Sequence, residues 1–466
     1  MKGLGQGKPL RWVIPIAALA LAMAACGTRV DKQAFYDALA EQQQTIITEG
    51  SAGSPPDGTT ASGGSSSNGG SQVLGTRSTA PGSVDTDPPS GGGASGGSAA
   101  AIPSHVSRAV IGDTITVGFH VPITGAAPLP LAWTDTLAAV EEWLNKEARI
   151  NGRGVRFVLE DDGYDPAKGL AACRKLADSN VLFVIGHTMP TVQERCSRFF
   201  NDRGIPYLIR GIPESTLQGA PLTWFGTASD DFQARALAQY VLKRMGGATK
   251  KVAIVTENDQ PVSKEVFART IRAGGGDVVA IENSVPRQPD FGPIISKLRQ
   301  AGAEIVFLNI APVDAIKIAV QSQGEGFHPT WVGEGTHWNY NLTLESAGKA
   351  LDGAVALSNW ASIDSPAANG FKAVLKKYRP NAVPDDVGLV IWGWTNLVRT
   401  ALLDTGKDLS RASFAAALNR LDFDQPYWHR VRFTPTDHRG ARAVAVFRAD
   451  GTAKRWRQIE GFSAGF

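Results

Sequence analysis

The stretch that decides the fold is "FVIGHTMPTVQERCSRFFNDRGIPYLI", residues 183–209. An apolar run ends in a Gly-His-Thr loop, a polar segment with an amphipathic pattern follows, and a second apolar run ends the stretch. This order predicts a strand, a turn, a helix and a second strand. The loop after the first strand of such a unit is where ligands bind, so the question is whether a ligand there is transformed or only held.

The same alternation continues in both directions from residue 113 onward. Apolar strands are predicted in two series, at 115–119, 155–160, 181–185 and 207–209, and then at 251–256, 277–282, 305–309 and 330–332. Helices are predicted at 131–147, 166–179, 191–202, 231–244, 263–273, 291–301, 313–323, 366–378 and 386–403. The segment 430–459 predicts short antiparallel strands with turns at 437–440 and 450–451. Strands this apolar are covered on both faces, so the sequence predicts an α/β protein with two doubly wound, Rossmann-like lobes.

The N-terminal quarter differs in composition. Residues 1–25 begin with basic residues, continue with an apolar run over 12–25 and end in small residues before Cys26, which is similar to a lipoprotein signal peptide. Three residues before the cysteine, Met23 stands where lipoprotein signal peptides usually have Leu. The alternative is a plain secretory signal with an incidental cysteine. We therefore expect lipidation of Cys26 and anchoring to the outer face of the bacterial cell membrane. Residues 26–49 form a short segment that is a candidate helix, and 50–108 are Gly/Ser/Pro-rich and predict a disordered tether before a ligand-binding domain over 109–466.

Composition and motifs argue against several classes of function. The chain of 466 residues has 47 basic and 44 acidic side chains, so its charge does not favour nucleic acid. We find no phosphate-binding loop, no dinucleotide fingerprint and no local zinc pattern, and we predict no catalytic residue, metal or cofactor. His187 and His337 each follow a strand and are either loop hydrogen-bonding groups or ligand contacts. The cluster "EDDG" at 160–163 is either a charged loop that caps the next helix or a metal or acid/base pair.

Several landmarks in fixed order carry a resemblance to a known family. They include "ITVGFHVPITG" (115–125), the stretch 183–209, "KVAIVTENDQ" (251–260) and "WVGEG" (331–335). From residue 113 to its end the chain resembles the solute-binding proteins of branched-chain amino acid (Leu/Ile/Val-binding) ABC transporters, which have the type I periplasmic-binding fold. The resemblance implies that a ligand is held in a cleft between the lobes and not transformed, so the protein is not expected to be an enzyme.

The resemblance also implies how the chain is divided and what it contacts. Three crossing segments join the lobes, near 226–229, 356–359 and 433–437. Lobe 1 is expected over about 113–227 and 357–432, and lobe 2 over about 228–356 and 433–466. The closed form is expected to dock on an ABC transporter permease. A sensing receptor that signals to a membrane partner is the alternative, and an exported enzyme is a third possibility.

Site residues are carried over position by position. The first hydroxyl position that clamps an amino acid carboxylate falls on Pro190, with Thr191 beside it, and the second clamping loop falls on Gly211 and Pro213, without its Thr. The aromatic hydroxyl positions fall near Pro261 and Ala311 and are also lost, whereas the ammonium-binding acid is kept as Glu334. Residues expected to wall the site are Trp133, His337 and Trp338. The resemblance therefore implies a bulkier, partly apolar solute that is amino-acid-like, an aromatic acid or an amide.

Each of these residues has a purely structural alternative. Thr191 and Glu194 are spaced as a capping box, so Thr191 is either a helix cap or a ligand contact. Glu334 is either a ligand contact or a solvated loop acid, and Trp133 and Trp338 are either pocket walls or core aromatics. Cys173 and Cys196 lie on consecutive predicted helices over one sheet, which favours a disulfide over two buried thiols. The disulfide known in the family would fall at residues 164 and 189, a tyrosine and a methionine here, and is absent.

Overall fold

The computed structural model describes residues 102–125, 132–257, 261–335 and 338–466, apart from the side chain at position 132. These residues belong to one compact unit, 98–466. The predictions for the signal peptide, Cys26, the short segment, most of the tether and His337 lie outside the described residues. Among the described residues, no helix has the length and apolar character needed to cross a bilayer.

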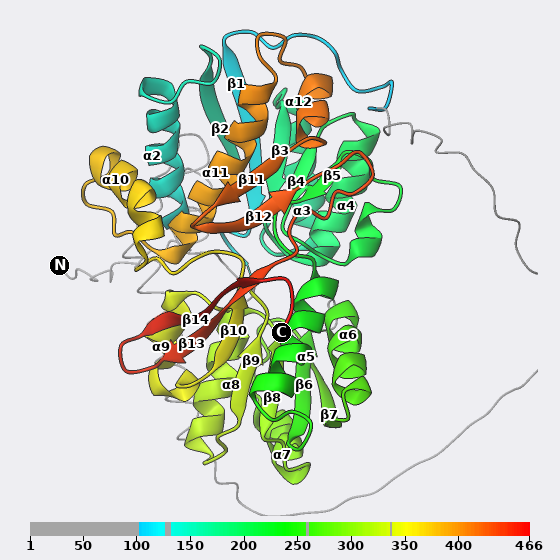
Figure 1. Ribbon diagram of the computed structural model, residues 1–466, viewed down its shortest axis with the longest axis vertical. Coiled ribbons are helices and arrows are strands. Elements are labelled where there is room, and N and C mark those ends of the chain that lie inside the picture. The colour runs from blue at the N-terminus through cyan, green and yellow to red at the C-terminus, as the bar shows by residue number, and fades with distance from the viewer. Residues whose placement is uncertain (1–101, 126–131, 258–260, 336–337) are drawn as a thin grey trace, which may run out of the picture. The chain divides into compact units, whose positions relative to one another are not determined.

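The first sheet has five parallel strands in the order β2-β1-β3-β4-β5 (Figure 1). The strands are β1 (Thr114–Val121), β2 (Gly154–Asp161), β3 (Phe183–Gly186), β4 (Tyr207–Ile209) and β5 (Thr223–Phe225). One face packs on α3 (Pro166–Asp178) and α4 (Pro190–Asp202), and the other on α2 (Ala132–Lys146), α11 (Asp386–Asp404) and α12 (Arg411–Leu418). Val184 belongs to the first of these cores and its neighbours Phe183 and Ile185 to the second, because successive side chains of a strand point to opposite faces.

The second sheet has seven strands in the order β14-β13-β10-β9-β8-β6-β7. Five of them are parallel, namely β6 (Lys251–Glu257), β7 (Asp277–Ser284), β8 (Ile305–Asn309), β9 (Thr330–Gly333) and β10 (Val355–Ser358). The antiparallel pair β13 (Val444–Asp450) and β14 (Arg455–Ser463) adds to this sheet beside β10. Helices α5 (Asp230–Arg244) and α6 (Pro261–Ala273) cover one face, and α7 (Gly292–Gln300), α8 (Pro312–Gly324) and α9 (Asn341–Ala347) cover the other.

The chain passes three times between the parts built on the two sheets, after β5, after β10 and after β12. The second passage leads to α10 (Asn369–Tyr378) and α11, and the third follows a two-stranded ribbon of β11 (Asp422–Gln425) and β12 (Trp428–Arg432). Short 3-10 turns, η2 (Glu214–Leu217), η3 (Gly348–Leu351) and η4 (Pro366–Ala368), complete the described elements. The prediction of an α/β protein with two doubly wound sheets is confirmed.

The predicted strands and long helices are present with ends shifted by one or two residues. Two strands match their predicted bounds without any shift, β4 and β8. The helix predicted over 366–378 is divided into η4 and α10, and short elements such as β5, β10, α9 and α12 were not predicted. These elements have three to eight residues.

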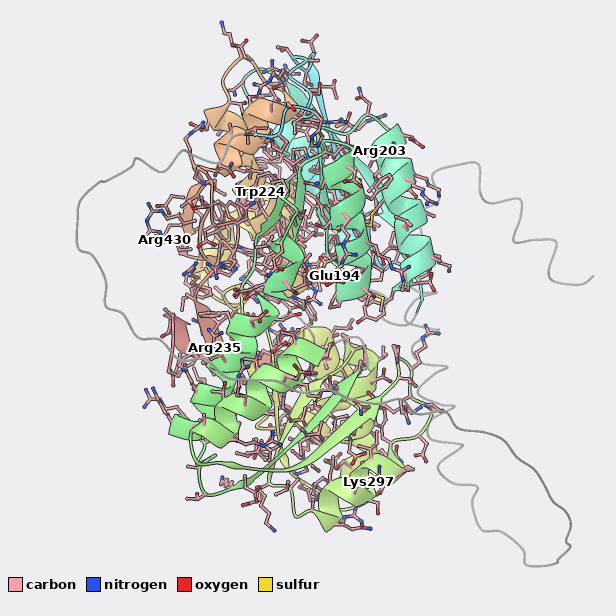
Figure 2. The ribbon with its side chains drawn as sticks, turned by 90° about the vertical axis from the view of Figure 1, so that its right-hand side faces the viewer. Glu194, Arg203, Trp224, Arg235, Lys297 and Arg430 are labelled. Carbon is pink, nitrogen blue, oxygen red and sulfur yellow. A yellow bond between two sulfur atoms is a disulfide. The ribbon has the colours of Figure 1, made fainter. Side chains whose placement is uncertain are left out.

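A disulfide joins Cys173 of α3 to Cys196 of α4, with Cα atoms 6.0 Å apart. Both residues are fully buried in the core that also contains Leu176 and Phe200. Figure 2 shows α4 with Glu194 near its start and Arg203 just past its end. The structure has the bonded pair and not the two free thiols, and the bond fixes α4 against the helix before it.

Candidate functional site

Buried polar residues gather at the carboxyl ends of the parallel strands in both sheets. His187 and Thr188 follow β3, Arg210 follows β4, and Glu334 follows β9, and each is at most 5% exposed. The loops beyond strand ends are where open α/β sheets bind ligands. This makes the strand ends the candidate site.

Helix α4 begins at this edge without a side-chain cap. Its N-cap is Met189, Pro190 is the first helical residue, and Thr191 is the second. The buried hydroxyl oxygen of Thr191 has no hydrogen-bond partner in the described part of the chain. The capping-box alternative for Thr191 is therefore wrong, because Pro190, which is favoured at the first helical position, starts the helix two residues earlier than a Thr191 cap requires.

His187 and Trp133 lie together beside this helix start. Their ring centroids are 6.2 Å apart, and neither His187 Nδ1 nor Trp133 Nε1 has a partner among the described residues. Burial, followed by the positive charge of Arg210, lowers the pKa of His187 to about 3, so its ring is neutral at physiological pH. The apolar part of the Trp133 ring packs in the core that contains α2, as expected for a core aromatic. Its indole N–H has no hydrogen-bond partner among the described residues.

Sequence reasoning missed Gln193 in the first turn of the same helix. Its side chain is fully buried, and neither its amide nitrogen nor its amide oxygen has a partner in the described residues. The only sequence signal was a polar residue beside the apolar Val192 on a helix with one buried face. Unsatisfied buried polar atoms are rare in folded proteins, so their concentration at one helix start points to a ligand.

A buried hydrogen-bond network holds the loop between β3 and α4. His120 Nδ1 lies 3.0 Å from Asp162 Oδ2, and His120 Nε2 lies 2.5 Å from the Tyr207 hydroxyl. Thr188 donates its hydroxyl proton to the other oxygen of Asp162, at 2.9 Å. Gly186 is needed here, since a Cβ at this position would lie 2.3 Å from the Tyr207 hydroxyl oxygen.

The acidic cluster at 160–163 therefore has a structural role that neither alternative described. Asp161 accepts hydrogen bonds from the backbone N–H groups of Ile123 and Gly163, which ties the loop after β1 to the loop after β2. The cap of α3 is Asp165, outside the cluster, so the prediction that the cluster caps this helix is wrong. His120 also lies close to the sulfurs of Cys173 and Cys196, but the disulfide and the bonds of His120 leave no metal ligands there.

Arg210 is a second residue that sequence reasoning missed. It is 4% exposed, donates from Nε to the Thr188 carbonyl at 2.9 Å, and forms an ion pair with Asp230 at 3.2 Å. The sequence feature that could have indicated Arg210 is an arginine directly after an apolar strand, in "YLIR". The predicted contact residue Gly211 donates its N–H to the Thr227 hydroxyl and accepts from Arg210, so the structure gives no support to a ligand contact there.

On the side of the second sheet, Glu334 is fully buried and accepts a hydrogen bond from the Ser263 hydroxyl at 3.1 Å. Burial, followed by the negative charge of Asp230, raises the pKa of Glu334 well above its usual range. The alternative of a solvated loop acid is therefore wrong. Pro261 begins α6 and Ala311 donates its N–H to Glu257 at 2.7 Å, so neither position offers a side-chain hydroxyl.

Trp338 lies in the core of the second sheet. Its Nε1–H donates to the Leu308 carbonyl at 2.9 Å, and its ring packs 5.6 Å from that of Trp456. These contacts agree with the core alternative and give no support to the prediction that Trp338 walls the site. His337, its neighbour, lies outside the described residues.

A family model described as "Periplasmic binding protein" matches residues 114–454, more than half of the chain, and the chain belongs to this family. Among curated relatives, the leucine-, isoleucine-, valine-, threonine- and alanine-binding protein of Pseudomonas aeruginosa is 25% identical over 265 residues, 55% of this chain and 70% of the relative. Membership of the family implies a binding protein that works outside the cytoplasm.

Solved structures agree with the fold. A branched-chain amino acid ABC transporter protein from Thermus thermophilus with bound valine has a TM-score of 0.66 and 18% identity, over 76% of this chain and 97% of that one. A solute-binding protein from R. palustris in complex with 4-hydroxybenzoate has a TM-score of 0.65 and 20% identity, over 76% and 98%. At these identities the likeness concerns the fold, the type I periplasmic-binding fold that the sequence predicted.

Proposed function

We propose that this protein is an exported, lipid-anchored receptor that binds a small, partly apolar solute and delivers it to an ABC transporter permease. The observation that carries the proposal is the group of buried polar atoms around the start of α4, on Trp133, His187 and Thr191, that have no hydrogen-bond partner within the part of the chain that the structure describes. Leaving such an atom unpaired in the interior costs about 1–3 kcal/mol, so a ligand that pairs with several of them gains affinity.

The bound end of the solute is a carboxylate or another hydrogen-bond acceptor. The Trp133 indole and the Thr191 hydroxyl are donors, and the start of α4 presents backbone N–H groups and the positive end of the helix dipole. Arg210 adds a nearby positive charge, part of which Asp230 offsets. This combination favours an anionic group over a cationic one.

The rest of the solute is apolar and larger than the side chain of valine. The resemblance implies that the hydroxyl positions of the family fall on Pro190 and near Pro261 and Ala311, and their loss supports an aromatic acid, an amide or an amino-acid-like compound. The amino acids bound by the relative from Pseudomonas aeruginosa and the 4-hydroxybenzoate in the structure from R. palustris belong to the same range of small carboxylates.

The proposal also includes the membrane anchor and the division of the chain into two lobes. Cys26 carries the lipid, and 50–108 form the tether. Lobe 1 comprises about 113–227 and 357–432, and lobe 2 comprises about 228–356 and 433–466. Replacement of Cys26 by Ser should move the protein from the membrane fraction to the soluble fraction of cells. Membrane association that is unchanged in this variant contradicts the anchor and leaves the binding function intact.

Ligand binding is tested by a thermal-shift screen of the complete chain against amino acids, aromatic acids, amides and sugars, followed by calorimetry. Thr191→Val keeps the shape of the side chain and removes the hydroxyl, and should weaken binding of the best compound about 3- to 10-fold. Thr400→Val, at an exposed position of α11, is the matched control and should bind as the wild type does. Unchanged affinity of the Thr191 variant removes this residue from the site, and a strong shift with leucine or valine alone contradicts the argument from the missing hydroxyls.

A further inference from the structure

Gln193 has a buried amide group that the fold does not use. It is fully buried in the first turn of α4, and neither Nε2 nor Oε1 has a hydrogen-bond partner among the residues that the structure describes. Gln233 of α5 is equally buried, but its amide donates to the Ala228 carbonyl at 2.8 Å and accepts from the Gly335 N–H at 2.9 Å. Buried amides normally resemble that of Gln233, because an unpaired one costs stability. Gln193 therefore needs a partner from outside the described chain.

The position of Gln193 on α4 places it at the edge of the first sheet where the candidate site lies. Ser197, four residues further on, lies on the same side of α4, and its hydroxyl oxygen is 2.6 Å from that of Thr223, the first residue of β5. Four helical residues span about 6 Å, which is also the length of about two strand residues. Because a crossover helix runs in the opposite direction to the parallel strands that it joins, Gln193 lies level with the carboxyl end of β5.

The side chain of Gln193 leans from there toward the start of the helix. In an α-helix the Cα–Cβ bonds are tilted toward the N-terminus, and long side chains extend over the residues three and four positions earlier. For Gln193 these are Pro190, the first helical residue, and Met189, the N-cap. Pro190 is the position on which the resemblance places a hydroxyl that this chain lacks. The amide of Gln193 therefore extends toward the same point from one turn deeper in the helix.

We propose that Gln193 takes the place of the hydroxyl missing at Pro190 and is a specificity-determining residue, which selects solutes whose polar end carries a hydrogen-bond donor beside its acceptor. The inference rests on the proposed function and narrows its solutes to a class, of which 2-hydroxy acids and primary amides are examples. Simple carboxylates, which have acceptors only, are the solutes that Gln193 selects against.

The hydrogen-bonding groups around the start of α4 explain this selection. The indole N–H of Trp133 and the backbone N–H groups of the helix start are donors only, so they pair with a carboxylate or carbonyl oxygen of the solute. Gln193 adds an acceptor, Oε1, to this set of donors. A simple carboxylate leaves Oε1 unpaired in the complex, whereas a hydroxyl or an amide N–H beside the acceptor pairs with it. One such bond should raise the affinity about fivefold.

The first test needs no solute. Gln193→Met keeps about the length of the side chain and removes both polar atoms, so the melting temperature of the complete chain should equal or exceed that of the wild type. Gln233→Met is the matched variant, because it removes a buried amide that is paired, and it should lower the melting temperature by at least about 3 °C. A similar loss in Gln193→Met means that its amide stabilises the fold and overturns the inference.

The second test uses two probes that differ only in a hydroxyl group beside the carboxylate, mandelate and phenylacetate, in calorimetry with the complete chain. The wild type should bind mandelate at least about fivefold more tightly, and Gln193→Met should reduce this preference to within about twofold. Gln323→Met, at an exposed position of α8, is the matched control and should keep the preference. Equal affinity of the wild type for the two probes, or a preference that Gln193→Met keeps, overturns the inference.

A failure of this inference differs from a failure of the proposed function. If neither mandelate nor phenylacetate binds and the wider screen finds another solute, the ligand class is wrong and the proposed function stands. A screen that is negative throughout contradicts the proposed function and with it the inference, whatever the melting temperatures show.

Discussion

Asp386 offers a quantitative test of how the two sheets are held together. It lies in the first turn of α11, which packs on the first sheet, and it accepts a hydrogen bond at 2.7 Å from the backbone N–H of Asn341, at the start of α9 on the second sheet. Asp386 is 5% exposed, and burial, followed by the neighbouring charge of Asp385, raises its pKa to about 7. We predict that this one carboxyl makes the folded protein less stable as the pH rises.

The sign and the size follow from the pKa of Asp386 in the two states. In the unfolded chain the pKa of an aspartate is about 3.9, so between pH 4 and 7 the folded state holds a proton that the unfolded state has lost. The contribution of Asp386 to the free energy of unfolding is therefore fully present below about pH 4, falls as the pH rises, and levels off above about pH 7. Each pH unit costs about 1.4 kcal/mol, so from pH 4.5 to 7 the loss is about 3 kcal/mol.

The perturbation is Asp386→Asn, which keeps an oxygen acceptor for Asn341 and cannot ionise. Urea unfolding of both proteins at pH 4.5, 6, 7 and 8 should show a stability difference in favour of the variant that widens by about 3 kcal/mol. For a unit of this size that corresponds to roughly 4 °C in melting temperature. Asp364→Asn, at an exposed position, is the control. A difference that stays constant from pH 4.5 to 8 refutes the reasoning.

Three further predictions concern the core. The double replacement Cys173→Ala with Cys196→Ala opens a loop with a sequence separation of 23 and should cost about 3 kcal/mol in unfolding free energy, measured in urea, while ligand affinity stays the same. Gly186→Ala places a methyl group 2.3 Å from a tyrosine hydroxyl and should lower the free energy of unfolding by about 1–3 kcal/mol. Gly461→Ala, with open space around it, is the control and should leave stability unchanged. Equal melting temperatures for the two variants contradict the close approach at Gly186. Trp338→Phe removes the donor to a buried carbonyl and should cost about 1–3 kcal/mol without changing ligand affinity, and a change in affinity returns this residue to the site.

The α/β architecture could be predicted from the sequence because its signal is local and repeated. Runs such as 252–255 are apolar on both faces, since successive side chains of a buried strand enter two different cores. The helices between them show a single apolar stripe. Three or four residues do not establish a period, so β5 and β10 were not predicted, whereas the equally short β4 was predicted because it closes the strand, helix and strand unit over 183–209.

The site was less accessible to prediction, because its chemistry depends on pairs that are distant in the sequence. For Thr191, spacing indicated a helix cap and the resemblance implied a ligand contact, and the observed start of α4 at Pro190 rejects the cap. Gly211 and Trp338 were carried over by position, and their hydrogen bonds to Thr227 and Leu308 depend on contacts that no local pattern records.

By itself, the sequence determined the order of strands and helices, the two doubly wound sheets and the family, since these depend on periodicity and on the order of landmarks along the chain. The tertiary structure alone decided which charges are buried and what they face: Arg210 against Asp230, Asp386 against the start of α9, and Glu334 against the hydroxyl of Ser263. The physical reason is that the free energy of a charge depends on the solvent and the charges around it in space, and folding brings those together from segments far apart in the chain.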